Sequence, residues 1–168
     1  PVVLITGAGG EIGHGLIARL TASGRTSVVT LDVNPLDSSL APLVAREFTG
    51  SILDTALLER ILSQYEVDTV FHLAALKHVP LCEQHPLEAI ATNAWATSRL
   101  ADLALAHGVA HFTLVSTDKA VAPSCVMGAT KRAAETYLQS LEGTPTTNFA
   151  AVRFGNVLGS NGSVLPLF

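Results

Sequence analysis

Residues 2–13, VVLITGAGGEIG, decide the fold that this sequence of 168 residues predicts. The stretch opens with an apolar run rich in β-branched side chains, Val2–Thr6, which is typical of a strand buried inside a parallel sheet. Glycines follow at positions 7, 10 and 13, and the apolar residues after them recur with the spacing of a helix. The sequence therefore predicts a strand, a tight glycine turn and a helix that ends at Gly24.

Each glycine of the turn has a physical role in binding a dinucleotide. Gly7 permits the tight turn, Gly10 lets the backbone approach a pyrophosphate, and Gly13 lets the helix pack closely against the strand. The amides around Glu11 and Ile12, at the start of the helix, are expected to face the phosphates, because a helix N-terminus attracts anions. A tight loop without a ligand is the alternative interpretation of the same residues.

A second strand is predicted over Val28–Asp32, and it ends on a carboxylate about 20 residues after the glycines, as the dinucleotide-binding pattern requires. Asp32 can accept hydrogen bonds from both ribose hydroxyls and would repel a 2′-phosphate. No arginine directly follows it to bind such a phosphate. We therefore expect NAD rather than NADP as the cofactor.

The rest of the chain alternates between predicted strands and helices, without an internal repeat. This alternation favours a single doubly wound α/β domain over residues 1–168, a Rossmann-type parallel sheet with helices on both faces. Charged residues are only 14% of the chain, as expected when strands are apolar on both sides. Further strands are expected at Glu47–Gly50, Thr69–Leu73, His111–Ser116 and Ala150–Phe154, and helices at Thr55–Tyr65, Pro86–His107 and Cys125–Ser140.

The composition argues against several classes of partner. A net charge of −4, with no run of basic residues, argues against a nucleic-acid surface. No apolar run is long enough to span a membrane and no signal peptide is visible, so a membrane is expected only through regions absent from this chain. Cys82 and Cys125, the only cysteines, favour reduced thiols and a cytoplasmic location, at the cytoplasmic face of the inner membrane if the full-length protein is anchored. The start at Pro1 and the end at Phe168 predict a fragment of a longer protein.

Small and polar residues follow the predicted strands, where open α/β sheets bind ligands. Ala74 and Ala75 leave room for a flat cofactor to lie close. Asp54 is expected either to bond an adenine amino group or only to cap the next helix, whose cap is Asp54 or Thr55. Asn93 lies in a mostly apolar helix and must satisfy its amide, so it either braces the loop below the cofactor or is exposed.

Four potential metal ligands lie close together in the sequence, namely His72, His78, Cys82 and His85. Their spacing is not that of a zinc site, and two of them fall on different local structures. We therefore expect no metal, and we expect His72 to be a packed strand residue.

Residues 116–131, STDKAVAPSCVMGATK, follow the strand His111–Ser116 at the ligand-binding edge of the predicted sheet. They combine a pair of hydroxyls, a carboxylate and two lysines. On a helix, Met127 and Lys131 share a face because they are four residues apart. Acid, base and cation then meet near one point, as a proton-transferring site needs. A polar loop followed by a surface helix is the alternative.

The glycine pattern and four further motifs resemble the extended short-chain dehydrogenases/reductases, and within them the nucleotide-sugar 4,6-dehydratases of bacterial polysaccharide biosynthesis. These enzymes act on UDP-N-acetylglucosamine, and some relatives act as 4-epimerases. The glycine motif is shared by the whole superfamily, whereas the other four are more specific. The motifs are TGAGGEIG (Thr6–Gly13), AALKHVP (Ala74–Pro80), STDKAV (Ser116–Val121), MGATKRAAE (Met127–Glu135) and RFGNVLGSNGSVLPLF (Arg153–Phe168).

The resemblance implies a dehydration that proceeds through a transient oxidation. Bound NAD takes a hydride from sugar C4, the C5 proton is removed, the C6 hydroxyl leaves as water, and the hydride returns to C6. By similarity, Asp118 is the acid, Lys119 is the C5 base and Thr117 bonds the O4 oxygen. Lys119 must be partly neutral to act as a base, which burial beside Lys131 or Lys77 would favour.

The resemblance also implies binding roles for residues around this pair. Lys131 is expected to hold the nicotinamide ribose, and Ser116 to lie in the cofactor site. Lys77 is expected near both the cofactor and the sugar, and His78 near the sugar. Asn156 is expected near the diphosphate of a UDP-sugar substrate, and a homo-oligomer is a further expectation.

Two departures from the family pattern affect these expectations. Met127 stands four residues before Lys131, where the superfamily has its catalytic tyrosine, and a thioether cannot transfer a proton. A membrane-anchored branch of the dehydratases also carries Met there, and Asp118, Lys131 or a water are the candidates for the missing base. The family's C-terminal substrate domain is missing from this chain, so the piece is expected to bind NAD but to turn over poorly. A UDP-sugar 4-epimerase and a non-catalytic NAD-binding module are the alternatives.

Overall fold

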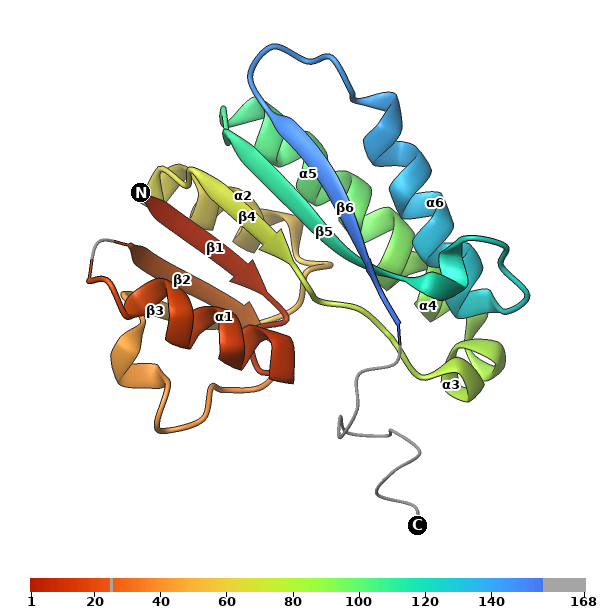
Figure 1. Cartoon of the computed structure of the whole chain (residues 1–168), viewed down its shortest axis with the longest axis horizontal. Coiled ribbons are helices and arrows are strands. Elements are labelled where there is room, and N and C mark those ends of the chain that lie inside the picture. The colour runs from red at the N-terminus through yellow and green to blue at the C-terminus, as the bar shows by residue number, and fades with distance from the viewer. Residues whose placement is uncertain (25, 156–168) are drawn as a thin grey trace.

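A six-stranded sheet with the strand order β3-β2-β1-β4-β5-β6 forms the centre of the computed structural model, which describes residues 1–24 and 26–155. Every neighbouring pair of strands is parallel. The predicted doubly wound α/β fold is therefore confirmed (Figure 1). The strands are β1 (Val2–Thr6), β2 (Ser27–Asp32), β3 (Arg46–Thr49), β4 (Thr69–His72), β5 (His111–Thr117) and β6 (Asn148–Phe154).

Helices connect the strands and lie on both faces of the sheet (Figure 1). Helix α1 lies against one face, and α2, α5 and α6 lie against the other, as expected for right-handed crossovers that run toward opposite edges of the sheet. The α-helices are α1 (Glu11–Thr21), α2 (Thr55–Tyr65), α3 (Val79–Gln84), α4 (Pro86–Ile90), α5 (Ala96–Ala106) and α6 (Val126–Ser140), joined by the 3₁₀ turns η1 (Ala41–Leu43) and η3 (Asp118–Ala120) and the π-helical turn η2 (Ala91–Trp95).

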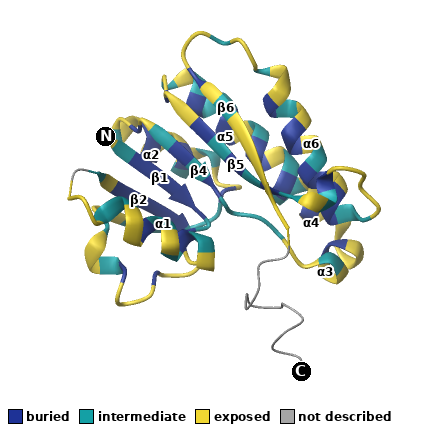
Figure 2. Ribbon diagram, in the orientation of Figure 1, coloured by how far each residue is buried: buried dark blue, intermediate teal, exposed yellow. Residues whose placement is uncertain are grey.

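The alternation of side chains along β1 separates two apolar cores. Val3 and Ile5 pack on one face with Ile17 of α1. Leu4 faces the other way and shares a core with Leu58 of α2 and with residues of α5 and α6. The inner strands are accordingly buried, as the dark blue of β1 and β2 shows in Figure 2. Burial of the sheet on both sides explains the low content of charged residues.

The chain changes its direction across the sheet after β3. Strands β1, β2 and β3 follow one another toward one edge, whereas β4, β5 and β6 follow one another toward the other. A topological switch point therefore lies between β1 and β4, and the loops at the carboxyl ends of these strands are where such sheets bind ligands.

The structure corrects several predicted boundaries. The helix predicted over Pro86–His107 is interrupted by η2, and a π turn of this kind inserts one extra residue and often marks a functional site. Helix α1 ends at Thr21, before Gly24, although Gly24 does have a positive φ of 64°. The short helix α3 was not predicted, because six residues that include a proline carry little periodic signal.

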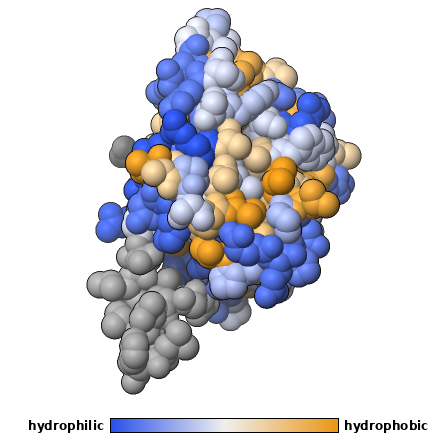
Figure 3. Space-filling view, turned by 90° about the vertical axis from the view of Figure 1, so that its right-hand side faces the viewer, coloured by the Kyte–Doolittle hydropathy of each residue, from blue (hydrophilic) through white to orange (hydrophobic). Residues whose placement is uncertain are grey.

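Large apolar side chains are exposed on the short helices, among them Leu81 of α3 and Leu87 and Ile90 of α4. Figure 3 shows apolar patches between polar residues on the side of the molecule that it presents. The homo-oligomer stays a prediction, because no partner chain is present to test it. Within the two described ranges, no helix is both long and apolar enough to cross a membrane, and attachment through other regions also stays a prediction.

Candidate functional site

The glycine turn after β1 is packed so tightly that a side chain at either of two of its glycines would force the backbone to shift. Gly7 has a φ of 72°, and a Cβ there would lie 2.5 Å from the backbone nitrogen of Ala74. A Cβ on Gly13 would lie 2.3 Å from the carbonyl oxygen of Ala8, directly after β1. The turn is therefore pressed against α1 on one side and against the loop after β4 on the other.

Gly10 differs from these two glycines. The nearest protein atom to a Cβ at Gly10 would be the Gly7 carbonyl oxygen at 3.6 Å, which is an ordinary contact. Gly10 is also the N-cap of α1, and no side chain caps this helix end. The packing of the described residues therefore does not require a glycine at position 10, whereas a diphosphate close to the backbone would require one. This arrangement fits a dinucleotide at the turn.

Asp32, at the end of β2, is held beside the turn. One carboxylate oxygen accepts a hydrogen bond of 2.9 Å from the Gly9 amide, and the other accepts one of 2.9 Å from the Asn34 amide. Each oxygen has a second lone pair, so the carboxylate can still accept bonds from ribose hydroxyls. The carboxylate thus lies next to the glycine turn, as expected of a residue that binds the ribose of a dinucleotide.

The loop after β4 is braced by Asn93 from the π turn η2. The Asn93 Oδ1 accepts a bond of 2.8 Å from the Leu76 amide, and its Nδ2 donates to the Leu76 carbonyl at 2.9 Å and to Thr130 Oγ1 at 3.0 Å. The prediction that Asn93 is either a brace or exposed is thus resolved, because the side chain is buried and binds the loop. Ala74 and Ala75 precede this point of attachment and are half-buried.

The remaining predicted binding residues lie on the surface or outside the described ranges. Asp54 is exposed and caps α2 by accepting a bond of 3.0 Å from the Leu57 amide, so the cap interpretation is confirmed and the adenine contact stays a prediction. Lys77 and His78 are exposed in the loop before α3. Asn156 lies outside the described residues. No group of three or more His, Cys, Asp or Glu side chains within residues 1–24 and 26–155 is placed to hold a metal ion.

Lys131 is a buried cation on α6 that reaches back to the sheet. Its ammonium donates a bond of 2.7 Å to the Val115 carbonyl of β5, and the residue is only 5% exposed. Burial lowers the pKa of Lys131 to about 8, although the Glu135 carboxylate acts in the opposite direction. A fraction of Lys131 is therefore neutral in mildly alkaline solution, so it can both supply positive potential and accept a proton.

Met127, one helical turn before Lys131, is buried in a small apolar cluster with Cys82 and Ala89. It fills space and has no proton to transfer. The neighbouring Gly128 is needed for packing, because a Cβ there would lie 2.4 Å from the Lys119 carbonyl oxygen. This contact brings the start of α6 against the backbone of the Asp118–Ala120 turn.

Asp118 and Lys119 form an exposed ion pair at the carboxyl end of β5. The Lys119 ammonium lies 3.4 Å from Asp118 Oδ1, and the two side chains are 39% and 56% exposed. Thr117 Oγ1 donates to the same carboxylate oxygen at 3.0 Å, and this hydrogen bond is the main reason that the pKa of Asp118 lies below its ordinary value. Lys119 was expected to be buried beside Lys131 or Lys77, but among the described residues its side chain is 39% exposed.

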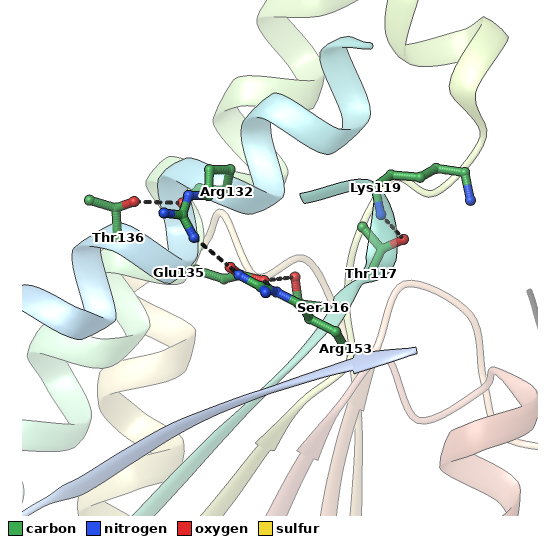
Figure 4. Close-up of polar contacts among 7 residues, drawn as sticks. All are labelled: Ser116, Thr117, Lys119, Arg132, Glu135, Thr136 and Arg153. Atoms are coloured by element: carbon green, nitrogen blue, oxygen red, sulfur yellow. Dashed lines mark hydrogen bonds and ion pairs between the residues drawn. The ribbon is translucent and has the colours of Figure 1, made fainter. Parts of the chain in front are cut away.

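Ser116 contributes its hydroxyl to a buried cluster around Glu135 (Figure 4). Glu135 is 2% exposed and accepts bonds from Arg153 Nε at 3.0 Å and Arg153 Nη2 at 2.6 Å. Burial raises the pKa of Glu135, but the hydrogen bonds from Arg153 and Ser116 outweigh it and hold the pKa below its ordinary value. The cluster therefore contains an ionised carboxylate that ties α6 to β5 and β6, one turn after Lys131.

A model of the polysaccharide biosynthesis protein family matches residues 3–168. The chain belongs to this family. Among curated relatives of this chain, the capsular polysaccharide biosynthesis protein CapD of Staphylococcus aureus is 43% identical. The alignment covers 99% of this chain and 30% of CapD. An inverting UDP-N-acetylglucosamine 4,6-dehydratase of Campylobacter jejuni is 39% identical over 73% of the chain and 37% of its own length. A UDP-glucose 4-epimerase of Rickettsia canadensis is 32% identical over 99% of the chain and 52% of its own length.

The solved structure of MoeE5 in complex with UDP-glucose and NAD superposes on this chain with a TM-score of 0.80 and 30% identity. The alignment covers 92% of the chain and 54% of MoeE5. The chain thus spans about half, or less, of the length of the relatives that it matches.

The sequence analysis did not predict the Glu135–Arg153 ion pair. Glu135 lies in the motif Met127–Glu135, and Arg153 begins the motif Arg153–Phe168. One signal was available, because Glu135 stands four residues after Lys131 and therefore on the same face of α6. The predicted residues Thr117, Asp118, Lys119 and Lys131 do gather at one edge of the sheet, and the structure adds that only Lys131 is buried there.

Proposed function

We propose that this chain is the NAD-binding domain of a nucleotide-sugar 4,6-dehydratase that acts on UDP-N-acetylglucosamine in surface polysaccharide biosynthesis. The observation that carries the proposal is the Asp118–Lys119 pair, which follows β5 at the ligand-binding edge and lies against the start of the Lys131 helix. Elimination of water needs an acid and a base close together, whereas a simple oxidation at C4 needs only one base. The 39% identical relative with the same named activity supports this choice.

The turn around Gly10 and the N-terminus of α1 hold the diphosphate of NAD in this proposal, and Asp32 holds the adenosine ribose. Bound NAD supplies reversible hydride acceptance, from sugar C4 and then back to C6. Lys131 holds the second ribose, and its positive charge favours loss of the proton from the 4-hydroxyl. Thr117 is proposed to donate its hydroxyl proton to O4 of the sugar once substrate binds, in place of the Asp118 oxygen that accepts it in this structure.

The acid and base roles of Asp118 and Lys119 need a proton to pass between them. In this chain both side chains are open to solvent, with 3.4 Å between the Lys119 nitrogen and the Asp118 carboxylate oxygen. A substrate and a second domain that cover the pair would remove water, which destabilises two charges more than two neutral groups. Transfer of one proton from Lys119 to Asp118 then leaves an amine that removes the C5 proton and an acid that protonates the departing C6 hydroxyl.

A UDP-sugar 4-epimerase is the second candidate, because a 32% identical relative is named as a UDP-glucose 4-epimerase. The two reactions share oxidation at C4 and differ in whether C6 loses its hydroxyl. A non-catalytic NAD-binding module is the third candidate, and Met127 in place of a tyrosine is the observation that favours it. We also propose a cytoplasmic location, in which thiols such as the free Cys82 and Cys125 stay reduced.

The test is incubation of the full-length protein with UDP-N-acetylglucosamine, with the products followed by NMR. A 4-keto product with a C6 methyl group is the result that we expect. A product changed only at C4 would instead identify an epimerase. Bound NAD with no change in the sugar would favour the non-catalytic module.

A further inference from the structure

Five buried polar residues are joined by hydrogen bonds through the core, from β1 to α6. The link between Thr97 and Asn93 is made by the Asn93 backbone carbonyl, and the other links join side chains. They come from β1, β4, the η2–α5 segment and α6, and each is less than 5% exposed. The line begins directly before Gly7 of the glycine turn and ends directly before Lys131. Its members, in order, are Thr6, His72, Thr97, Asn93 and Thr130.

The central member is His72, whose two ring nitrogens are both used. Thr97 Oγ1 donates its only proton to the Asn93 backbone carbonyl at 2.8 Å. In the 2.9 Å contact between Thr97 Oγ1 and His72 Nε2, the histidine must therefore be the donor. Burial lowers the pKa of His72 to about 3, so the ring carries a single proton at neutral pH. Nδ1 is therefore an acceptor, and Thr6 Oγ1 donates to it at 2.6 Å.

The second half of the line has an equally defined direction. Asn93 Nδ2 donates to Thr130 Oγ1 at 3.0 Å, and Thr130 Oγ1 donates to the Met127 carbonyl at 2.8 Å. The reversed orientation of the Asn93 amide would place its oxygen against the Leu76 carbonyl, which cannot donate. The hydrogen bonds of the line thus have one consistent set of donors and acceptors.

We propose that this line is a positioning device that sets the glycine turn and the Lys131 helix at the separation one dinucleotide needs, with His72 as its central positioning residue. The inference rests on the proposed binding of NAD. A fully satisfied buried network permits one arrangement of the elements that it joins, because any shift leaves a donor or acceptor unpaired in the core. This line joins the strand that ends in the phosphate-binding turn to the helix that carries the cation for the second ribose.

Thr97 offers the cleanest way to interrupt the line, in the full-length protein. Thr97→Val keeps the shape and removes the hydroxyl, whereas Thr97→Ser keeps the hydroxyl and loses a methyl group. Thr30→Val is the matched control, because Thr30 is also buried in the sheet, at 1% exposure, and its Oγ1 has no hydrogen-bond partner among the described residues. The control therefore makes the same chemical change without breaking a bond.

The first measurement is the dissociation constant for NAD, which needs no turnover of a sugar. Thr97→Val removes both hydrogen bonds of the Thr97 hydroxyl, and we expect it to raise this dissociation constant roughly tenfold. Thr97→Ser should stay within about twofold of the unchanged protein, and so should Thr30→Val. Equal affinity of Thr97→Val and Thr30→Val would overturn the proposal. If Thr97→Val does not fold, Thr6→Val interrupts the line at its first bond and is judged by the same comparison.

The second measurement is hydrogen exchange in the cofactor-free protein, which separates this inference from the proposed function. Interruption at Thr97 should speed exchange at both ends of the line, in residues 7–13 and 126–131, and leave α2 unchanged. Failure of the unchanged protein to bind NAD would refute the proposed cofactor, and the exchange pattern would then decide on the line itself. Uniform acceleration, or none, would show that the network has no positioning role.

Discussion

The two halves of the candidate site are built in different ways. The glycine turn has a shape that is set by close packing of Gly7 against Ala74 and of Gly13 against Ala8. The Asp118–Lys119 half consists of charged side chains that are exposed to water. The proposed cofactor-binding turn is thus fixed by backbone packing among the described residues, whereas the proposed catalytic pair is open to solvent.

The contrast between two lysines makes the same point. Lys131 is buried and hydrogen-bonded to β5, so its lowered pKa comes from this chain alone. The Lys119 side chain is 39% exposed, and its ammonium lies 3.4 Å from Asp118 Oδ1. Its proposed role as a base depends on groups that would cover it, which is why the chain alone should bind NAD without efficient turnover.

The largest effect should come from removal of the exposed pair. In the full-length protein, Asp118→Asn and Lys119→Met should each lower the rate of 4-keto sugar formation by at least about 100-fold, as loss of a general acid or base does. Neither change should alter the melting temperature or the affinity for NAD, because both side chains lie at the surface. A variant that keeps its activity would remove that residue from the mechanism.

The packing of the turn should be the next most sensitive feature. Gly13→Ala should lower the free energy of unfolding by about 2–3 kcal/mol and weaken NAD binding, because its methyl group would meet the Ala8 backbone. Gly15→Ala, in the same helix with nothing within 4 Å of its Cβ, should instead stabilise by about 0.5–1 kcal/mol. Chemical denaturation measures both, and equal stabilities would contradict the packing argument.

The buried Glu135 should matter for the anchoring of α6. Glu135→Gln should lower the free energy of unfolding, measured with a denaturant, by about 2 kcal/mol. This cost is smaller than is usual for a broken buried ion pair, because the Arg153 side chain can still reach solvent. Arg99→Gln removes an exposed pair with Asp102, with 3.6 Å between the charged atoms, and should change stability by less than about 0.5 kcal/mol. Similar costs for the two variants would mean that burial of Glu135 does not strengthen the contact.

The smallest expected effect is a pH dependence of stability that comes from His72. Its pKa is about 3 in the folded chain against 6.5 as the ordinary value, so the unfolded chain binds the proton first as the pH falls. The contribution of His72 to the free energy of unfolding should therefore be fully present above pH 6.5. Below that pH it should decrease by up to about 1.4 kcal/mol per pH unit. Urea unfolding between pH 5 and 7 should show a slope that is reduced in His72→Gln, and an identical slope in both proteins would assign the effect to other groups.

Much of the fold could be predicted because its signals are local. The apolar run Val2–Thr6, the glycine spacing and the acid at Asp32 each depend on residues close together in the chain, and the structure has the predicted doubly wound parallel sheet. The cap at Asp54 is local in the same sense. The interruption of the long helix at Asn93 was not predictable, because the cause is a contact with Leu76 from another part of the chain.

Apolar periodicity predicts which chemical groups reach the carboxyl edge of the sheet, since it locates the strand ends and the residues after them. Which of those groups are buried depends on how the helices pack against the sheet, and the sequence pattern does not show this. Lys119 and Lys131 are the same residue type twelve positions apart, yet one faces water and the other is enclosed between α6 and β5. The same packing sets the hydrogen bonds of His72, which accepts from Thr6 and donates to Thr97. Such bonds between distant segments of the chain exist only after the sheet and its helices have packed.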